Sequence, residues 1–186
     1  MKVISGILKG RNIKGYDIEG TRPTMDRVKE SLFAMIQDNI RASVVLDLFA
    51  GSGSLGIEAI SNGAEYSYFV DNNIEVIKVL NENISNFNIK NNTKVLHMDY
   101  NKALKYFKEN NIKFDIIFID PPYDYRVIDK VIRKLTDFDI LNDDALVIIE
   151  YKNKFSEITN LSLYKEKKYA DKYISIYRNI SKIREN

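Results

Sequence analysis

A glycine-rich segment at residues 51–56 constrains the fold of this chain more than any other feature. Its glycines at positions 51, 53 and 56 satisfy the pattern G-x-G-x-x-G, between a short apolar run at 44–49 and a stretch with helical spacing. Glycine permits a tight turn and lets the backbone approach a ligand closely. A strand, a glycine turn and a helix in this order indicate an open α/β sheet that binds a ligand beyond the carboxyl end of its first strand.

The rest of the chain alternates between strand-like and helix-like segments, as this fold requires. Apolar residues recur at helical spacing between the strands, for example from Ile128 to Leu135. Runs that are apolar on both faces, as in parallel strands covered by helices, occur at 44–49, 66–70, 94–98, 114–119 and 145–150. Two more runs, at 161–164 and 173–177, follow each other with no helix between them. The pattern predicts an α/β, Rossmann-like fold: a mostly parallel seven-stranded sheet ending in an antiparallel hairpin.

The first 42 residues follow a different pattern. Residues 2–14 are punctuated by glycines and predict a small β-hairpin, and the stretch after them predicts a helix with Val28, Leu32 and Ile36 on its apolar face. We therefore divide the chain into an N-terminal extension at 1–42 and a ligand-binding domain at 43–186.

Length, composition and charge exclude several classes of protein. The chain has 186 residues, enough for one domain with a small extension, and no cysteine, which excludes disulfides and thiolate metal sites. Its apolar runs are strand-sized, well below the ~20 residues that span a bilayer. We expect a soluble, cytoplasmic protein, with a monomer as the default. The net charge is +2, but basic residues gather at both ends, which would favour a phosphate backbone as partner.

Three aspartates at the ends of the first three core strands indicate which ligand binds. Asp71 can chelate a ribose diol and Asp99 can accept a hydrogen bond from an adenine amino group, which suits a dinucleotide and S-adenosylmethionine alike. Asp47 separates the two, because a carboxylate inside the first strand repels a pyrophosphate but suits a cationic sulfonium and an amino-acid group. We therefore expect S-adenosylmethionine. The candidate cofactor-binding residues are Asp47, Phe49, Ala50, Gly51, Ser52, Gly53, Asp71, Asn72, Asp99 and Tyr100.

The loop after the fourth core strand carries the candidate catalytic residues Asp120, Pro121, Pro122 and Tyr123. Two prolines stiffen the turn and leave its carbonyls exposed. An aromatic amino nitrogen is a poor nucleophile because its lone pair is delocalised into the ring. A carboxylate and a backbone carbonyl that accept its two hydrogens would localise the lone pair and orient it towards a methyl donor. Tyr123 offers a ring on which an unstacked base can lie.

The motifs resemble a known family, the RsmD-type 16S rRNA guanine-N2 methyltransferases, over nearly the full length. The resembling segments are residues 3–11, 22–33, 47–56 and 120–123. The signature at 22–33, which reads RPTMDRVKESLF, is far more specific than the glycine turn or the proline loop. One departure is Asp71, because the family tends to carry a glutamate directly after the valine of this strand.

This resemblance implies a class I S-adenosylmethionine-dependent methyltransferase fold and a guanine N2 in 16S rRNA as the methyl acceptor. It also implies that the rRNA is presented on an assembled or partly assembled 30S particle. Lys9, Arg11, Arg22 and Arg27 are the candidate RNA contacts, although Arg22 and Arg27 could instead pair with acids of their own helix.

Several alternatives remain at this point. A DNA adenine-N6 methyltransferase can share the Asp-Pro-Pro-Tyr loop, but such enzymes generally need a target-recognition region for which this chain has little room. A protein glutamine methyltransferase would favour asparagine at position 120 and an additional helical domain. A non-catalytic module that binds S-adenosylmethionine is disfavoured by the complete set of aspartates. We expect no metal site, and we interpret His97 as a packed or edge residue rather than a catalyst.

Overall fold

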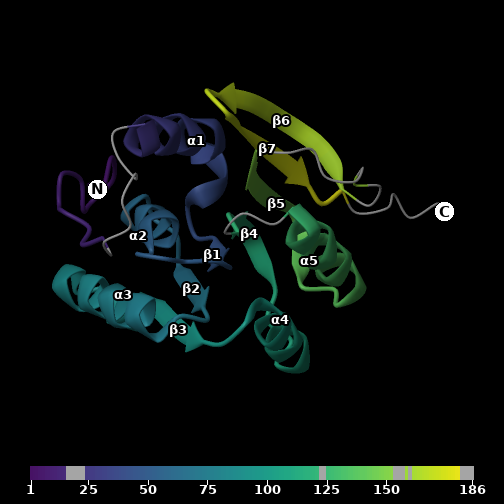
Figure 1. Cartoon of the computed structure of the whole chain (residues 1–186), viewed down its shortest axis with the longest axis horizontal. Coiled ribbons are helices and arrows are strands. Elements are labelled where there is room, and N and C mark those ends of the chain that lie inside the picture. Colours follow the sequence, from purple (N-terminus) through teal and green to yellow (C-terminus); the bar gives the residue numbers. More distant parts are fainter. Residues whose placement is uncertain (16–23, 122–124, 153–157, 159–160, 181–186) are drawn as a thin grey trace.

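The computed structural model describes residues 1–15, 24–121, 125–152, 158 and 161–180 (Figure 1). Its elements are α1 (Thr24–Ile40), β1 (Val44–Asp47), α2 (Ser54–Ser61), β2 (Tyr66–Asp71), α3 (Ile74–Phe87), a 3-10 turn (Lys90–Asn92), β3 (Thr93–His97), α4 (Tyr100–Glu109), β4 (Phe114–Ile119), α5 (Tyr125–Asp137), β5 (Leu141–Tyr151), β6 (Ser162–Tyr169) and β7 (Lys172–Arg178). No helix among these described residues has both the length and the apolarity needed to cross a membrane.

One seven-stranded sheet with the order β3-β2-β1-β4-β5-β7-β6 forms the centre of the molecule. The strands from β3 to β5 are parallel to one another, and β7 is antiparallel to both β5 and β6. This confirms the predicted α/β fold with its C-terminal antiparallel hairpin. The strand order reverses between β1 and β4, and in open α/β sheets ligands bind at such a switch point, beyond the carboxyl ends of the strands.

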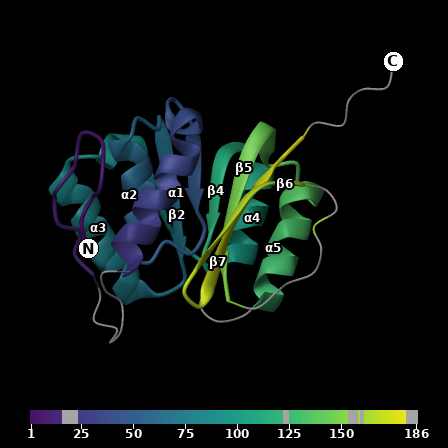
Figure 2. The same cartoon turned by 90° about the horizontal axis from the view of Figure 1, so that it is seen from above.

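Helices cover both faces of the sheet, which explains why the core strands are apolar throughout. Figure 2 shows α1, α2 and α3 on one side and α4 and α5 on the other, and each layer has its own apolar core. On the α1 face, the rings of Phe33 and Phe118 lie 5.9 Å apart between centroids. On the opposite face, the rings of Phe107 and Phe114 lie 4.8 Å apart. Side chains on the same face of neighbouring strands therefore pack against the same layer of helices.

The N-terminal segment forms a short, irregular version of the predicted hairpin, with one antiparallel bridge between Lys2 and Asn12. The intervening residues form turns that pack on α2, as Figure 1 shows. Gly6 allows this approach: its φ is +76°, and a Cβ there would lie 1.8 Å from the carbonyl oxygen of Ser61. Backbone hydrogen bonds within the segment join residues 1–3 to residues 10–13, as in a short hairpin. The amides of Ile4, Ser5, Ile7 and Leu8 donate to Glu58 and Ser61 of α2 instead, so the hairpin stays short.

Candidate active site

The glycine turn links β1 to α2 at the switch point of the sheet. Gly51 and Gly53 have φ values of +53° and +80°, a region that glycine adopts without strain. A Cβ on Gly53 would lie 2.4 Å from Leu80 Cδ1, and one on Gly56 would lie 2.3 Å from Phe69 Cε1. The three glycines therefore set the turn and let α2 pack directly against β2. The amide of Ala50, which donates to the Val70 carbonyl at 2.9 Å, ties the turn to the neighbouring strand.

Backbone amides hold the three aspartates at the carboxyl ends of β1, β2 and β3. Asp47 Oδ2 accepts from the Gly56 amide at 3.1 Å, and Asp71 accepts from the amides of Gly51 and Asn73 at 3.1 and 2.9 Å. Asp99 is the N-cap of α4 and accepts from the amides of Asn101 and Lys102 at 2.9 and 3.2 Å. Because these strands are adjacent, the three carboxylates form a row with fixed positions, and each keeps lone pairs for a ligand.

Asp47 has the electrostatics of a site for a cationic ligand. Burial raises the pKa of its carboxyl to about 7, the Gly56 hydrogen bond lowers it, and the nearby Asp71 raises it further. A positive charge placed beside Asp47 would therefore be stabilised as it restored the ionised form. The sulfonium and ammonium groups of S-adenosylmethionine fit this requirement, and a pyrophosphate does not.

The remaining predicted cofactor residues surround the same edge. The rings of Phe49 and Tyr100 lie 5.7 Å apart, and both are only partly buried. Ser52 is buried, and its carbonyl accepts from the Asn83 side chain at 3.0 Å. Asn72 is exposed, and its carbonyl lies 3.2 Å from Nε2 of His97 on the edge strand β3. The structure thus places His97 at an exposed sheet edge, away from the β1–β4 switch point.

Asp120 directly follows β4, the strand beside β1. Loss of hydration by burial is the largest cause that raises the pKa of this carboxyl to about 7, followed by Glu150; Lys172 lowers it and Asp47 raises it. By its accessible surface Asp120 is an exposed residue, although many protein atoms surround its carboxyl. Pro121 is half-buried beside it, whereas Pro122 and Tyr123 lie outside the described residues.

In the described part of the chain, the candidate RNA-binding residues Lys9 and Arg11 belong to the N-terminal segment and Arg27 belongs to α1. Arg11 lies 4.7 Å above the Phe87 ring and donates to the Asn86 carbonyl, at the end of α3. Lys9 is exposed, beside Leu8, whose amide donates to Ser61 at the end of α2. These helix ends are opposite to the ends that begin near the glycine turn. Arg27 is exposed on α1, and Arg22 lies outside the described residues.

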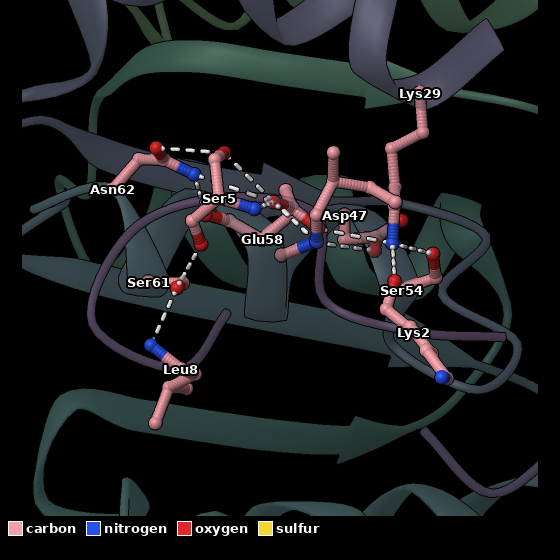
Figure 3. A network of polar contacts seen from close by, with 11 residues as sticks. Lys2, Ser5, Leu8, Lys29, Asp47, Ser54, Glu58, Ser61 and Asn62 are labelled. Atoms are coloured by element: carbon pink, nitrogen blue, oxygen red, sulfur yellow. Dashed lines mark hydrogen bonds and ion pairs between the residues drawn. The ribbon is translucent and has the colours of Figure 1, made fainter. Parts of the chain in front are cut away.

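A buried ion pair beneath the glycine turn is absent from the sequence-based prediction. Lys29 Nζ lies 3.0 Å from Glu58 Oε2, and the two side chains are 4% and 0% exposed. Glu58 also accepts from the amides of Ile4 and Ser5, and Lys29 donates to the carbonyl of Lys2 at 2.7 Å (Figure 3). The pair thereby joins the N-terminal segment, α1 and α2. Its signal in the sequence is a charge on an otherwise apolar helix face.

The sequence of this chain is similar to those of several known proteins. A family model described as conserved hypothetical protein 95 matches residues 1–178. Ribosomal RNA small subunit methyltransferase D of Buchnera aphidicola subsp. Acyrthosiphon pisum is 40% identical over 167 residues, which cover 89% of this chain and 86% of that protein. The chain belongs to the RsmD family. A second relative in the RsmD family, the protein of the same name from Escherichia coli K12, is 32% identical over 170 residues, 90% of this chain and 84% of that one.

Two solved structures have a fold similar to that of this chain. The structure of yhhF from Escherichia coli has a TM-score of 0.86 at 27% identity and covers 98% of this chain and 99% of that chain. A 16S rRNA N2 methyltransferase of T. thermophilus (RsmC), solved with AdoMet and guanosine, has a TM-score of 0.67 at 17% identity, over 88% of this chain and 45% of that chain. The second likeness shows a shared fold.

Proposed function

We propose that this protein transfers a methyl group from S-adenosylmethionine to the exocyclic N2 amino group of a guanine in 16S rRNA. The observation that carries the proposal is the position of Asp120, which follows β4 next to the glycine turn of β1 in a chain of the RsmD family. The relatives named above are small-subunit rRNA methyltransferases, which supports an rRNA acceptor over DNA.

The cofactor side of the site is formed by residues of β1, β2 and β3. Asp47 would face the cationic amino-acid end, Asp71 the ribose diol and Asp99 the adenine amino group, with the glycine turn beneath them. When bound, S-adenosylmethionine supplies an electrophilic methyl group. The amide hydrogen bonds to all three aspartates fix these side chains before any ligand arrives, which lowers the cost of binding.

The acceptor side consists of Asp120 and the proline loop. The carboxylate of Asp120 and the carbonyl of Pro121 accept the two hydrogens of the guanine amino group, so that its lone pair is less delocalised into the ring. This is catalysis by orientation and electrostatics rather than by a covalent intermediate. Methylation makes the nitrogen more acidic, and a carboxylate whose pKa is about 7 suits the uptake of the proton that it loses.

We further propose a division of labour along the chain. Residues 1–42 would be an extension that contacts rRNA, with Lys9, Arg11, Arg22 and Arg27 as candidate contacts, and residues 43–186 would be the methyltransferase domain. We place the reaction in the cytoplasm on an assembled or partly assembled 30S particle, with a monomer as the acting unit and no metal ion. Among the described residues, no group of three or more His, Cys, Asp or Glu side chains could hold a metal.

A methyl-transfer assay tests the proposal. Purified protein with labelled S-adenosylmethionine is incubated with 16S rRNA, 30S particles and assembly intermediates that lack the modification, and the products are digested to nucleosides. We expect label in N2-methylguanosine. Label in N6-methyladenine of DNA would support the adenine-N6 alternative. Cofactor binding without transfer to any RNA would instead indicate a non-catalytic module.

A further inference from the structure

Charged side chains continue across the sheet from the cofactor strand towards the C-terminal hairpin, on the α1 face. The register pairs Asp47 with Phe118 and Phe118 with Ile148, and it pairs Glu150 with Ile174. Side chains two residues apart in a strand point to the same face. Glu150, which follows Ile148 by two residues within β5, therefore projects from the same face as Asp47, and Asp120 directly follows the end of β4.

Glu150 has a cationic partner on the next strand. Lys172 lies two residues from Ile174 on β7, which makes it the diagonal neighbour of Glu150, and its Nζ forms an ion pair with Glu150 Oε1. The two side chains are 22% and 42% exposed, so the pair is open to a ligand. Both groups influence the carboxyl of Asp120 at the end of the neighbouring strand, because Glu150 raises its pKa and Lys172 lowers it.

The order of these charges follows the strand order. Beginning at the cofactor strand β1, the edge presents Asp120 after β4, then Glu150 at the end of β5, then Lys172 at the start of β7. Asp120 and Glu150 can each accept a hydrogen bond, and Lys172 can donate one. The Watson–Crick edge of guanine reads donor at N2, donor at N1 and acceptor at O6, whereas adenine presents an acceptor at N1.

We propose that Glu150, held in place by Lys172, is a specificity-determining residue that accepts the guanine N1–H while Lys172 donates to O6. The inference rests on the proposed function, because it assumes that Asp120 receives the amino group of the base. Neighbouring strands lie about 4.8 Å apart, and the longer Glu and Lys side chains can converge on one base edge from there. A base whose N1 is an acceptor would meet the Glu150 carboxylate with like polarity.

Binding of nucleosides tests this assignment without knowledge of the target nucleotide. The protein is saturated with S-adenosylhomocysteine, so that nucleosides cannot enter the cofactor site, and titrated with guanosine and with 2-aminopurine riboside. The second ligand keeps the 2-amino group but has an acceptor N1 and no O6. For the wild type, we expect guanosine to bind about tenfold more tightly, the effect of a hydrogen bond to a charged group. Glu150→Gln should reduce this ratio several-fold, because an amide can also donate to an acceptor N1, and the remainder reflects the O6 contact of Lys172.

Two further variants complete the experiment. Lys172→Gln should reduce the same ratio, since the O6 contact weakens. Glu75→Gln should leave it unchanged, because Glu75 forms an exposed pair with Lys78 on α3. An unchanged ratio in both Glu150→Gln and Lys172→Gln, in proteins that retain the wild-type thermal unfolding temperature, would overturn the inference.

The experiments distinguish a failure of the Glu150 and Lys172 assignment from a failure of the proposed function. If the wild type methylates guanine N2 in rRNA but the two variants keep the wild-type ratio, the inference alone is wrong. If the wild type transfers no methyl group to RNA and binds guanosine no better than 2-aminopurine riboside, the proposed function and the inference are both wrong.

Discussion

The acidic side chains at the carboxyl edge of the sheet fall into two groups that differ in their hydrogen bonds. The first half of the edge is formed by β1, β2 and β3, and the second half by β4 and β5. On β1, β2 and β3, the carboxylates of Asp47, Asp71 and Asp99 each accept at least one backbone amide. On β4 and β5, in the part of the chain that the structure describes, Asp120 and Glu150 accept none, and Glu150 pairs with Lys172. Under the proposed function, the first half is prepared in advance for a cofactor of constant structure. The second half would keep its acceptor capacity for a base that enters and leaves in every turnover.

This difference predicts which substitutions separate catalysis from cofactor binding. Removing an acid from the second half should affect transfer and spare cofactor binding, whereas removing an acid from the first half should weaken cofactor binding. The four predictions below test this division, beginning with the largest expected effect.

Asp120→Ala should abolish measurable transfer, with a loss of at least about 10²–10³ in kcat, because the amino group loses the acceptor that aligns it. The Kd for S-adenosylmethionine, measured by calorimetry, should change by less than about threefold. A parallel loss of cofactor affinity would mean that Asp120 belongs to the cofactor half and that the division is wrong.

Glu58→Gln should lower the free energy of unfolding by about 3 kcal/mol or more, because it leaves Lys29 charged and buried without a carboxylate. The Gln side chain also keeps only one of the two oxygens that accept from the amides of Ile4 and Ser5, and it places an NH2 group where the other oxygen was. Urea unfolding measures the effect. The matched control is Glu75→Gln, whose pair with Lys78 is more than half exposed and which should cost less than about 1 kcal/mol. Equal costs for the two variants would show that the buried network does not support the first half.

Transfer should depend on pH through Asp120. Burial, reinforced by Glu150, raises the pKa of this carboxyl to about 7, and the ionised form is the one that accepts the amino hydrogens. At saturating cofactor, kcat should therefore rise with pH up to about 7 and fall by about tenfold per pH unit well below it. Lys172→Gln removes a cation that lowers the pKa of Asp120, so the acid limb should move to higher pH. If the acid side of the kcat–pH profile does not shift in Lys172→Gln, Lys172 does not act on Asp120 and does not belong to the second half.

The sequence predicted the sheet and the first half of the site better than the second half. The period of the apolar residues and the glycine turn are local signals, and so are aspartates that directly follow strands. The pairing of Glu150 with Lys172 depends on β7 lying between β5 and β6, which the order of segments along the chain does not reveal. The predicted N-terminal hairpin is short for a similar reason, because the amides of Ile4 and Ser5 in its middle bond to a distant helix.

The smallest predicted effect separates the two roles of Asp99, which caps α4 and is proposed to accept from adenine. Asp99→Ser keeps a capping oxygen, so stability should change by only a few tenths of a kcal/mol, while cofactor affinity should fall several-fold. Asn73 caps α3 in the same manner, by accepting from the amide of Glu75, and has no proposed ligand. Asn73→Ala should therefore cost about 1 kcal/mol of stability and leave the Kd for S-adenosylmethionine unchanged. If both variants alter stability and affinity in proportion, Asp99 is a cap alone, and the first half holds its ligand with two acids rather than three.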